Sequence, residues 1–187
     1  MRIVAGAFRG RPLVAPKGHL TRPTADRTRQ ALFNVLAHAP WSKALGGRRA
    51  LDLFAGSGAL GLEALSRGAA FCLFVDKTPA ALQAIDANLD ALGARDRALV
   101  RRRDAGALGP RTKADGPPFD LVFLDPPYGQ GLGEAALAQL VAGDWLAPGA
   151  LVALERGAGD PRPPTPGFEM LDERVWGAAA VAFLRWP

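Results

Sequence analysis

Short apolar runs alternate with longer helical patterns from Arg49 onwards. The apolar runs lie at residues 50–54, 71–75, 98–100, 120–125 and 150–155, and the helical patterns between them lie at residues 60–66, 79–92 and 133–141. Because the runs are apolar on both faces, this order predicts a parallel sheet with helices on each side. Two later runs, at residues 168–177 and 179–186, predict an antiparallel strand pair that completes the sheet. The expected fold class is α/β.

The first 49 residues follow another pattern. Residues 2–15 hold two short apolar segments around Arg9-Gly10-Arg11, which predicts a small hairpin. A helical stretch follows Arg22-Pro23 and ends before Pro40, with Thr24 or Asp26 as its N-cap. Its apolar face consists of Ala31, Leu32, Val35 and Leu36.

Composition favours one globular domain in a reducing compartment. The chain has 187 residues, of which 49% are hydrophobic and 22% charged, enough for a sizeable core. One cysteine, Cys72, and the lack of a Cys/His cluster argue against a disulfide scaffold and a metal site. The chain starts without a signal-peptide pattern and has no membrane-spanning run. We therefore expect a cytoplasmic protein with no membrane or metal partner, and a monomer.

Charge is distributed unevenly along the chain. Up to Arg49 there are ten basic residues and one acidic residue, whereas the rest holds 13 basic and 17 acidic residues. A basic front on a slightly acidic body suggests contact with a polyanion, although a solvated cationic surface would have the same composition. The candidate phosphate contacts are Arg9, Arg11, Arg22, Arg27 and Arg29.

A glycine-rich loop follows the apolar run 50–54. Gly56, Gly58 and Gly61 match G-x-G-x-x-G between a predicted strand and a predicted helix, and Asp76 ends the next strand 20 residues after Gly56. In this context glycines let the backbone approach a nucleotide-like ligand, and the acid can accept hydrogen bonds from ribose hydroxyls. The alternative is a tight turn that only leads into the helix.

The acids around this loop favour one nucleotide-like ligand. Asp52 would repel the pyrophosphate of a dinucleotide, whereas S-adenosylmethionine has no phosphate and carries a sulfonium and an ammonium. Asp76 would then bind the ribose, and Lys77 would flank the adenine. Asp104 and Ala105 would lie near the adenine edge, although Asp104 could instead be a helix N-cap.

A second motif, Asp125-Pro126-Pro127-Tyr128, ends the strand at residues 120–124. Two prolines stiffen the backbone, so the Asp125 carboxylate and the Pro126 carbonyl can point at one place. These oxygens can accept hydrogens from a planar exocyclic amine while Tyr128 stacks on its base. The motif predicts methyl transfer to such an amine, and an ordinary Pro-Pro turn is the alternative.

These segments together carry a family resemblance. Residues 52–69, 74–77 and 125–128 resemble class I S-adenosylmethionine-dependent methyltransferases that act on exocyclic amines. GAFRGRPL at residues 6–13 and RPTADRTRQALFNVL at residues 22–36 resemble the RsmD family of bacterial 16S rRNA guanine-N2 methyltransferases. The likeness covers essentially the whole chain, and the second of these segments is its most specific part.

The resemblance implies a fold, a substrate and a set of site residues. The fold would be a Rossmann-like, mostly parallel sheet of seven strands with a reversed last hairpin. The substrate would be guanine 966 of 16S rRNA in the small ribosomal subunit or its assembly intermediate, methylated at N2. Residues 1–49 would be an RNA-binding extension and residues 50–187 the catalytic core. The implied cofactor-site residues are Thr24, Asp52, Phe54, Gly56, Gly58, Asp76, Lys77, Asp104 and Ala105, and Arg27 and Phe33 would lie at the mouth of the site.

Other functions share the same motifs. Adenine-N6 methylation of DNA and methylation of a glutamine amide also present a planar NH₂ group to an Asp-Pro-Pro-Tyr loop. No stretch is left for the separate target-recognition domain that a sequence-specific DNA methyltransferase normally needs. A third alternative is a non-catalytic protein that assists ribosome assembly, against which the intact motifs argue.

Overall fold

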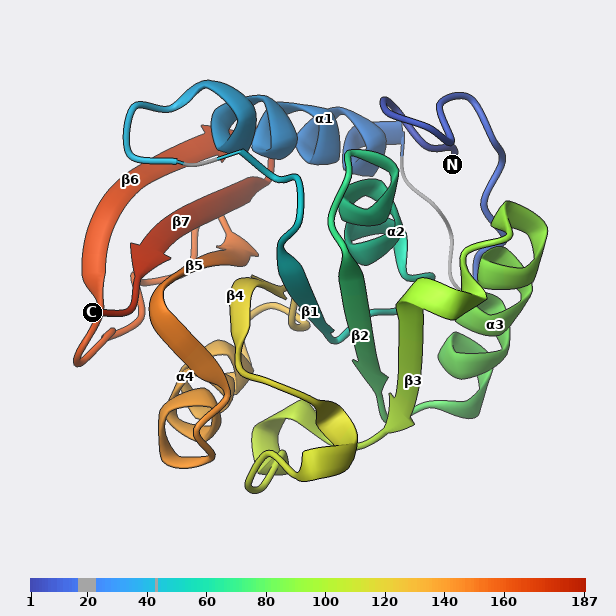
Figure 1. Ribbon diagram of the computed structural model, residues 1–187. Helices are drawn as coiled ribbons and strands as arrows, with labels where there is room; N and C mark the ends of the chain where they lie inside the picture. Colours follow the sequence, from blue (N-terminus) through green and yellow to red (C-terminus); the bar gives the residue numbers. More distant parts are fainter. Residues whose placement is uncertain (17–22, 43) are drawn as a thin grey trace.

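The fold is built on one seven-stranded sheet with the strand order β3-β2-β1-β4-β5-β7-β6 (Figure 1). This computed structural model describes residues 1–16, 23–42 and 44–187. Strands β1 to β5 are parallel to one another, and β7 is antiparallel to both β5 and β6. The strands are β1 (Arg49–Leu53), β2 (Phe71–Asp76), β3 (Ala98–Arg102), β4 (Phe119–Leu124), β5 (Leu146–Gly157), β6 (Glu169–Trp176) and β7 (Ala179–Arg185). The predicted parallel sheet and its closing antiparallel pair are confirmed.

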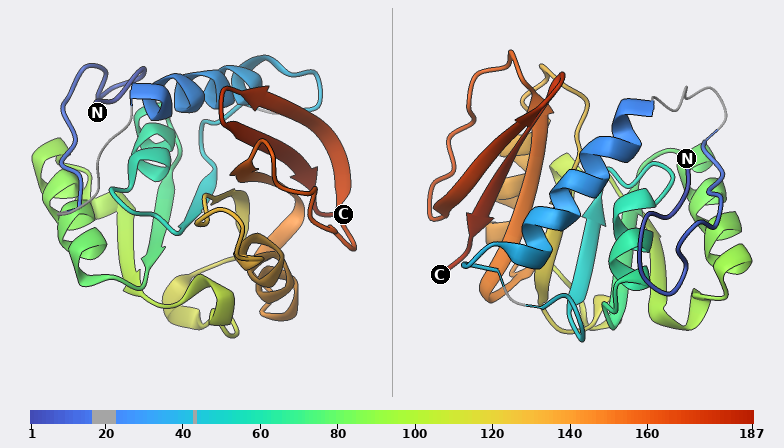
Figure 2. Two further views of the ribbon diagram at one scale, coloured as in Figure 1. Left: turned by 180° about the vertical axis from the view of Figure 1, so that it is seen from behind. Right: turned by 90° about the horizontal axis from the view of Figure 1, so that it is seen from above.

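Helices cover both faces of the sheet (Figures 1 and 2). On one face lie α1 (Pro23–His38), α2 (Ala59–Ser66) and α3 (Pro79–Leu92), whose apolar residues share one core cluster. On the other lie α4 (Leu132–Ala142) and the 3₁₀ turn η2 (Ala105–Ala107), which contribute to a second cluster. Two more 3₁₀ turns are η1 (Arg95–Arg97) and η3 (Lys113–Asp115). The two-sided burial explains why the central strands are apolar on both faces.

Helix α1 crosses the sheet obliquely (Figure 2). Phe33 is fully buried, and its ring centroid lies 5.4 Å from that of Phe123 in β4. The helix begins at Pro23, so Thr24 and Asp26 lie inside its first turn and the N-cap prediction for them is wrong. Proline is favoured at the first helical position because it needs no hydrogen-bond acceptor there, which explains the earlier start.

Residues 1–16 turn back on themselves but contain no regular strand. A single bridge joins Arg2 and Pro12. The chain therefore reverses direction as predicted, but the two predicted strands of the hairpin do not form. A few backbone hydrogen bonds join its two arms, such as Ile3 N to the Arg11 carbonyl oxygen at 3.0 Å. Other backbone groups bond to α2: Val4 and Ala5 donate to Glu63, and Phe8 donates to the Ser66 hydroxyl.

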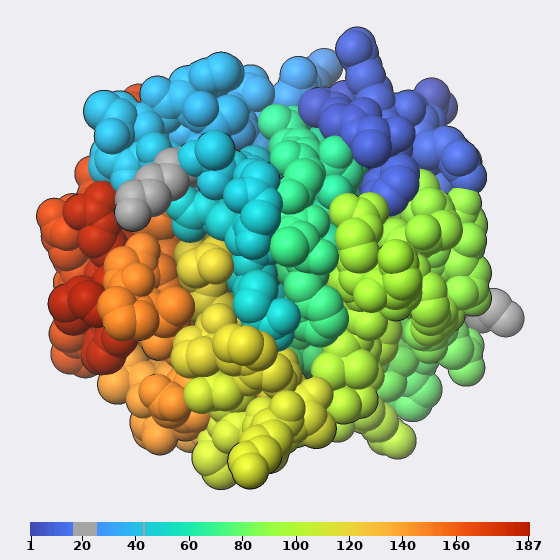
Figure 3. All heavy atoms as spheres, in the orientation of Figure 1, coloured from blue at the N-terminus to red at the C-terminus, as the bar shows by residue number. Residues whose placement is uncertain are grey.

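The turn of this segment lies at the amino-terminal edge of the sheet. Arg11 Nη2 donates to the Ala91 carbonyl oxygen at 2.5 Å, close to the end of α3. Because α3 follows β2 and leads back to β3, its last residues lie at the edge where the parallel strands begin. Figure 3 shows this N-terminal segment packed against α2 and α3. Among the described residues, no helix has the length and apolar character to cross a membrane.

Candidate active site

The carboxyl ends of five parallel strands meet at one edge of the sheet and bring five acids together. Asp52, Asp76 and Asp104 belong to the ends of β1, β2 and β3, and Asp125 and Glu155 belong to those of β4 and β5. Strands β1 and β4 are neighbours although two helices and two strands separate them in the chain. Ligands of open α/β sheets bind at such a switch point.

The glycine loop between β1 and α2 has the backbone of a binding loop. Phe54, which is not glycine, has a φ of 60°, and Gly58 has a φ of 76° at the start of α2. A side chain at Gly61 is excluded because its Cβ would lie 2.4 Å from Phe74 Cε1 and 2.6 Å from Cys72 Sγ. The third glycine therefore permits close packing of helix on sheet, and the strained Phe54 marks the turn that presents the loop.

Asp76 holds this loop in place. Its Oδ2 accepts from Gly56 N at 3.0 Å, and its Oδ1 accepts from Thr78 N at 2.9 Å and Thr78 Oγ1 at 2.8 Å. A carboxylate has about four acceptor sites, so Asp76 retains capacity for ribose hydroxyls. The position matches the ribose-binding role expected from the sequence, which stays a prediction.

Asp104 and Lys77 connect the ends of β2 and β3. Lys77 Nζ lies 3.3 Å from Asp104 Oδ2, and Asp104 Oδ1 accepts from Gly106 N at 2.9 Å. The Gly106 amide and the lysine together hold the pKa of Asp104 below its usual range. Asp104 is thus the N-cap of η2, the alternative weighed for it, and Ala105 is buried directly beside it. Its adenine-edge role remains a prediction.

Asp52 is a buried carboxyl beside the glycine loop. It is 1% exposed, and its Oδ2 accepts from Gly61 N at 2.9 Å. Burial raises its pKa to about 8; the Gly61 hydrogen bond lowers this pKa, and the charge of Asp76 raises it by a smaller amount. No ion pair within the described residues compensates Asp52. A cationic ligand fits a loop backed by this acid better than a phosphate does.

Replacement of the Asp52 carboxyl by an amide is expected to stabilise the ligand-free chain. The unfolded chain ionises this carboxyl near pH 3.8 and the folded chain near pH 8, so the wild type loses stability as pH rises between these values. Asp52→Asn takes up no proton on folding, so we expect its free energy of unfolding at pH 7 to exceed that of the wild type by on the order of 2–4 kcal/mol. Urea unfolding of both proteins at pH 4 and pH 7 measures the difference. A difference that does not change with pH would contradict the assignment.

The Asp125-Pro126-Pro127-Tyr128 loop follows β4 and lies beside the glycine loop across the β1–β4 pair. Burial by surrounding protein, then the charges of Glu155 and Asp52, raise the pKa of Asp125 well above its ordinary value. The Asp125 side chain is nevertheless exposed to solvent, and water weakens the effect of burial on its pKa. The negative charges of Glu155 and Asp52 are therefore the cause to which we attribute the raised pKa.

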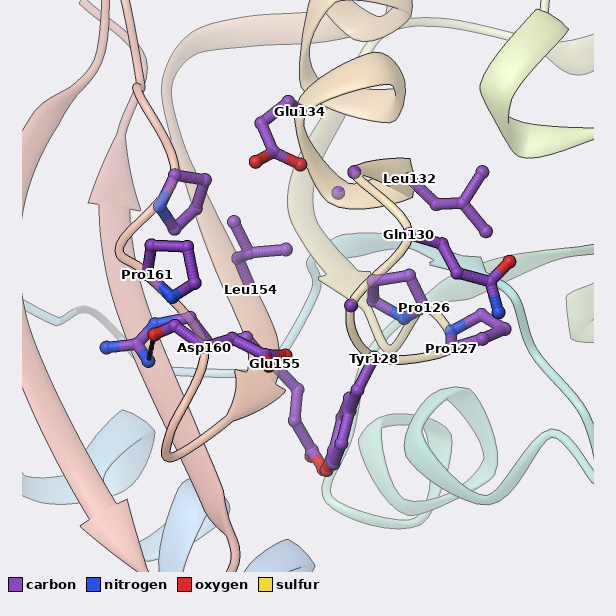
Figure 4. Close-up of a pocket in the computed structure, with 15 residues that line it drawn as sticks. Pro126, Pro127, Tyr128, Gln130, Leu132, Glu134, Leu154, Glu155, Asp160 and Pro161 are labelled. Carbon is purple, nitrogen blue, oxygen red and sulfur yellow. Dashed lines mark hydrogen bonds between the residues drawn. The ribbon is translucent and has the colours of Figure 1, made fainter.

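A pocket of about 190 Å³ opens beside this loop (Figure 4). Its walls are residues 126–134 on one side, and the end of β5 with Asp160, Pro161 and Pro163 on the other. Tyr128 is 42% exposed, and its hydroxyl donates to Glu155 Oε1 at 2.5 Å. The exposed ring next to Asp125 matches the stacking role expected for it.

Glu155 has no motif around it, and the sequence alone indicates no role for it. The structure shows that it is half-buried and that burial raises its pKa, while the Tyr128 hydrogen bond lowers it. Its place at the end of the apolar run 150–155 is the one signal in the sequence, and it predicts a position near the ligand-binding edge of the sheet. Its partner Tyr128 could not be found without the strand order.

Two predictions about the front segment are wrong. Arg29 is 4% exposed, its Nη2 donates to the Arg2 carbonyl oxygen at 2.6 Å, and its Nε lies 3.8 Å from Glu63. It therefore stabilises the fold and is not available to a phosphate. Phe33 lies in the core and not at the mouth of the site.

The other arginines predicted to contact phosphate lie in different parts of the molecule. Arg9 and Arg11 are exposed on the N-terminal turn, at the edge opposite Asp125, and Arg27 is exposed on α1. Arg22 and the side chain of Thr24 lie outside the described residues. Within the part of the chain that the structure describes, no cluster of three His, Cys, Asp or Glu residues could hold a metal ion.

Comparison with known proteins decides the family. The family model described as "Conserved hypothetical protein 95" matches residues 1–185. The relative named "Ribosomal RNA small subunit methyltransferase D" from Escherichia coli (strain K12) is 38% identical over 181 residues, 96% of this chain and 87% of the relative. The chain is a member of the RsmD family. The Haemophilus influenzae relative of the same name is 34% identical, over 95% of this chain and 89% of the relative.

Solved structures agree with membership of the RsmD family. The Escherichia coli protein yhhF has a TM-score of 0.85 and 38% identity, and the match covers 100% of this chain and 97% of that chain. A Streptococcus mutans structure at 14% identity, with a TM-score of 0.65 over 88% of this chain and 49% of that chain, shares the fold alone. The RsmD member described here is a methyltransferase with the Rossmann-like fold of S-adenosylmethionine-dependent methyltransferases.

Proposed function

We propose that this protein transfers a methyl group from S-adenosylmethionine to N2 of a guanine in small-subunit rRNA, the guanine at position 966. The observation that supports this best is the Asp125-to-Tyr128 loop at the same sheet edge as the glycine loop. The 38% identical relative is named a small-subunit rRNA methyltransferase, which favours this substrate over DNA adenine or a glutamine amide.

The chain's own residues would bind and orient the amine. The Asp125 carboxylate and the Pro126 carbonyl accept the two N2 hydrogens, and Tyr128 stacks on the base. The nitrogen lone pair then forms the new bond to carbon as the sulfur–carbon bond breaks. The amine becomes cationic and loses a proton to Asp125 or to water.

S-adenosylmethionine would supply the electrophilic methyl group. Asp52, Phe54, Gly56 and Gly58 would surround its amino-acid end, and Asp76, Lys77, Asp104 and Ala105 its nucleoside. The uncompensated acid behind the glycine loop supports a cationic cofactor over a dinucleotide. Thr24 is part of the same proposal through the family resemblance.

The RNA would contact the basic front, residues 1–49, in two places. Arg27 lies on α1, which starts near the carboxyl edge, whereas Arg9 and Arg11 lie at the amino edge. A substrate that reaches both must span the length of the strands, which favours structured RNA in the ribosomal subunit over a short fragment. A monomer in the cytoplasm would suffice for this reaction.

Product identity tests the proposal. Labelled S-adenosylmethionine is given in parallel to small ribosomal subunits, naked 16S rRNA and duplex DNA, followed by nucleoside digestion and mass spectrometry. We expect N2-methylguanosine from the ribosomal samples. N6-methyladenine from DNA, or no transfer despite cofactor binding, would refute the assigned substrate.

Charge removal at the N-terminal turn tests the remote contact. We expect Arg9→Gln/Arg11→Gln to bind the subunit RNA more weakly and to reduce the slope of log affinity against log salt by about one to two, since each lost phosphate contact contributes about one. Filter binding from low to high salt measures both quantities. Cofactor affinity serves as the control, and an unchanged affinity and slope would exclude this contact.

A further inference from the structure

The carboxyl end of β5 meets the side chain of Tyr128. Leu124 in β4 is in register with Leu154 in β5, so the residues that follow, Asp125 and Glu155, are neighbours across the two strands. Tyr128 Oη donates to Glu155 Oε1 at 2.5 Å, and Figure 4 shows the tips of these two side chains together. An acid next to the motif therefore holds the far end of its aromatic ring.

The backbone after Glu155 passes beside the same ring. A Cβ at Gly157 would lie 3.2 Å from Tyr128 Cδ2 and 2.8 Å from Asp160 Oδ2. Gly157 N donates to Asp160 Oδ2 at 3.2 Å, which closes the turn that leaves β5. The ring is thus confined along one side by a chain segment that approaches closely because residue 157 has no side chain.

A charged side chain fixes this segment. Arg156 Nη1 donates to the carbonyl oxygens of Gly157 at 3.0 Å and Asp160 at 2.7 Å, and its Nη2 lies 3.2 Å from Glu173 in β6. These bonds connect the turn to the neighbouring part of the sheet. The segment beside Tyr128 is therefore a supported part of the fold.

We propose that Glu155 is a positioning residue that holds the Tyr128 ring in the orientation needed to stack on the target base. An aromatic side chain that is 42% exposed would otherwise sample several rotamers, and its immobilisation would oppose substrate binding. The hydrogen bond to Glu155 fixes the Tyr128 hydroxyl in the folded protein. The entropy cost of ordering the ring is therefore incurred on folding and not on substrate binding. A phenylalanine at position 128 would lack this contact. The role in catalysis rests on the proposed function, whereas the hydrogen bond itself does not.

One measurement tests the contact without any activity. Tyr128 is the one tyrosine of the chain, so protein labelled with ¹³Cζ-tyrosine gives a single assignable NMR resonance. We expect Glu155→Ala to shift this resonance away from its wild-type position, and Glu155→Gln, whose amide oxygen can still accept, to shift it less. The same resonance position in wild type and Glu155→Ala would overturn the proposal.

A double-mutant cycle tests the functional role on small ribosomal subunits. We expect Tyr128→Phe and Glu155→Ala each to lower kcat/KM by about three- to tenfold, chiefly through KM, with unchanged cofactor affinity. If Glu155 acts through the hydroxyl, the double variant is no worse than either single one, and Glu155→Gln restores part of the loss. Additive losses, or a loss in kcat alone, would overturn it.

The two tests separate this proposal from the proposed function. A wild type that yields no N2-methylguanosine but shows the expected NMR shifts contradicts the reaction and leaves the contact in place. A wild type that methylates guanine, with Tyr128→Phe, Glu155→Ala and the double variant all equal to it in rate, contradicts the positioning role alone.

Discussion

Asp125→Asn is expected to reduce methyl transfer to small ribosomal subunits by about a hundred- to a thousandfold, because the reacting amine loses the charge that stabilises its developing cation. The asparagine amide keeps one acceptor oxygen, but its NH₂ group faces the hydrogens of the substrate amine. Single-turnover transfer from labelled S-adenosylmethionine measures the chemical step directly.

Cofactor affinity and a surface variant serve as controls for this experiment. Calorimetric titration should give S-adenosylmethionine affinities for Asp125→Asn close to those of the wild type. Asp144→Asn removes an acid whose side chain is 81% exposed, at a φ of 56° that asparagine tolerates well. It should keep the full rate. If Asp125→Asn also keeps it, the assigned role of Asp125 is wrong.

Glu63→Ala is expected to destabilise the fold by about 3–5 kcal/mol, since it removes one partner from a buried charge network. Glu63 is fully buried and accepts from Val4 N at 2.8 Å, Ala5 N at 3.0 Å and Arg67 Nε at 2.8 Å, with Arg29 Nε at 3.8 Å. Its loss leaves Arg29 without its acid on α2 and two backbone amides without acceptors. Urea unfolding measures the change, and hydrogen exchange should show faster exchange in residues 3–13.

An exposed acid provides the matched comparison. Glu169 in β6 pairs with Arg185 at 3.1 Å, and its side chain is 63% exposed. Glu169→Ala should therefore cost less than about 1 kcal/mol. Equal effects of the two substitutions would show that Glu63 does not hold the N-terminal segment.

The parts of the site that were predictable are those encoded by local sequence. The strand ends at Asp76 and Asp125 follow from apolar runs that stop at an acid, Asp52 lies within the run 50–54, and the glycine spacing places the loop between strand and helix. These patterns lie within a few residues of the positions they describe. The mostly parallel sheet of seven strands with its reversed last hairpin followed from the alternation of strands and helices together with the family resemblance, whereas the order of the strands did not.

The residues that were misjudged depend on distant partners. Arg29 lies off the apolar stripe of α1, and this position favoured a surface role. Its side chain is buried because it pairs with Glu63, which lies 34 residues further along the chain. Glu155 meets Tyr128 across the β4–β5 pairing, which no local pattern reveals. The location of the N-terminal turn depends in the same way on its docking to α2 and α3.

The packing of the front segment also limits how this protein can be divided. Ile3, Leu13, Phe33 and Leu36 are buried in the same cluster as the central strand residues Leu121 and Phe123. A fragment that began at residue 50 would expose the part of this sheet face that the front segment covers, including Phe123, which lies two residues before Asp125. Residues 1–49 are therefore not an independent domain. Fused to another methyltransferase core, they would lack the sheet face on which they pack. Without them, this core would expose apolar side chains and would be prone to aggregate.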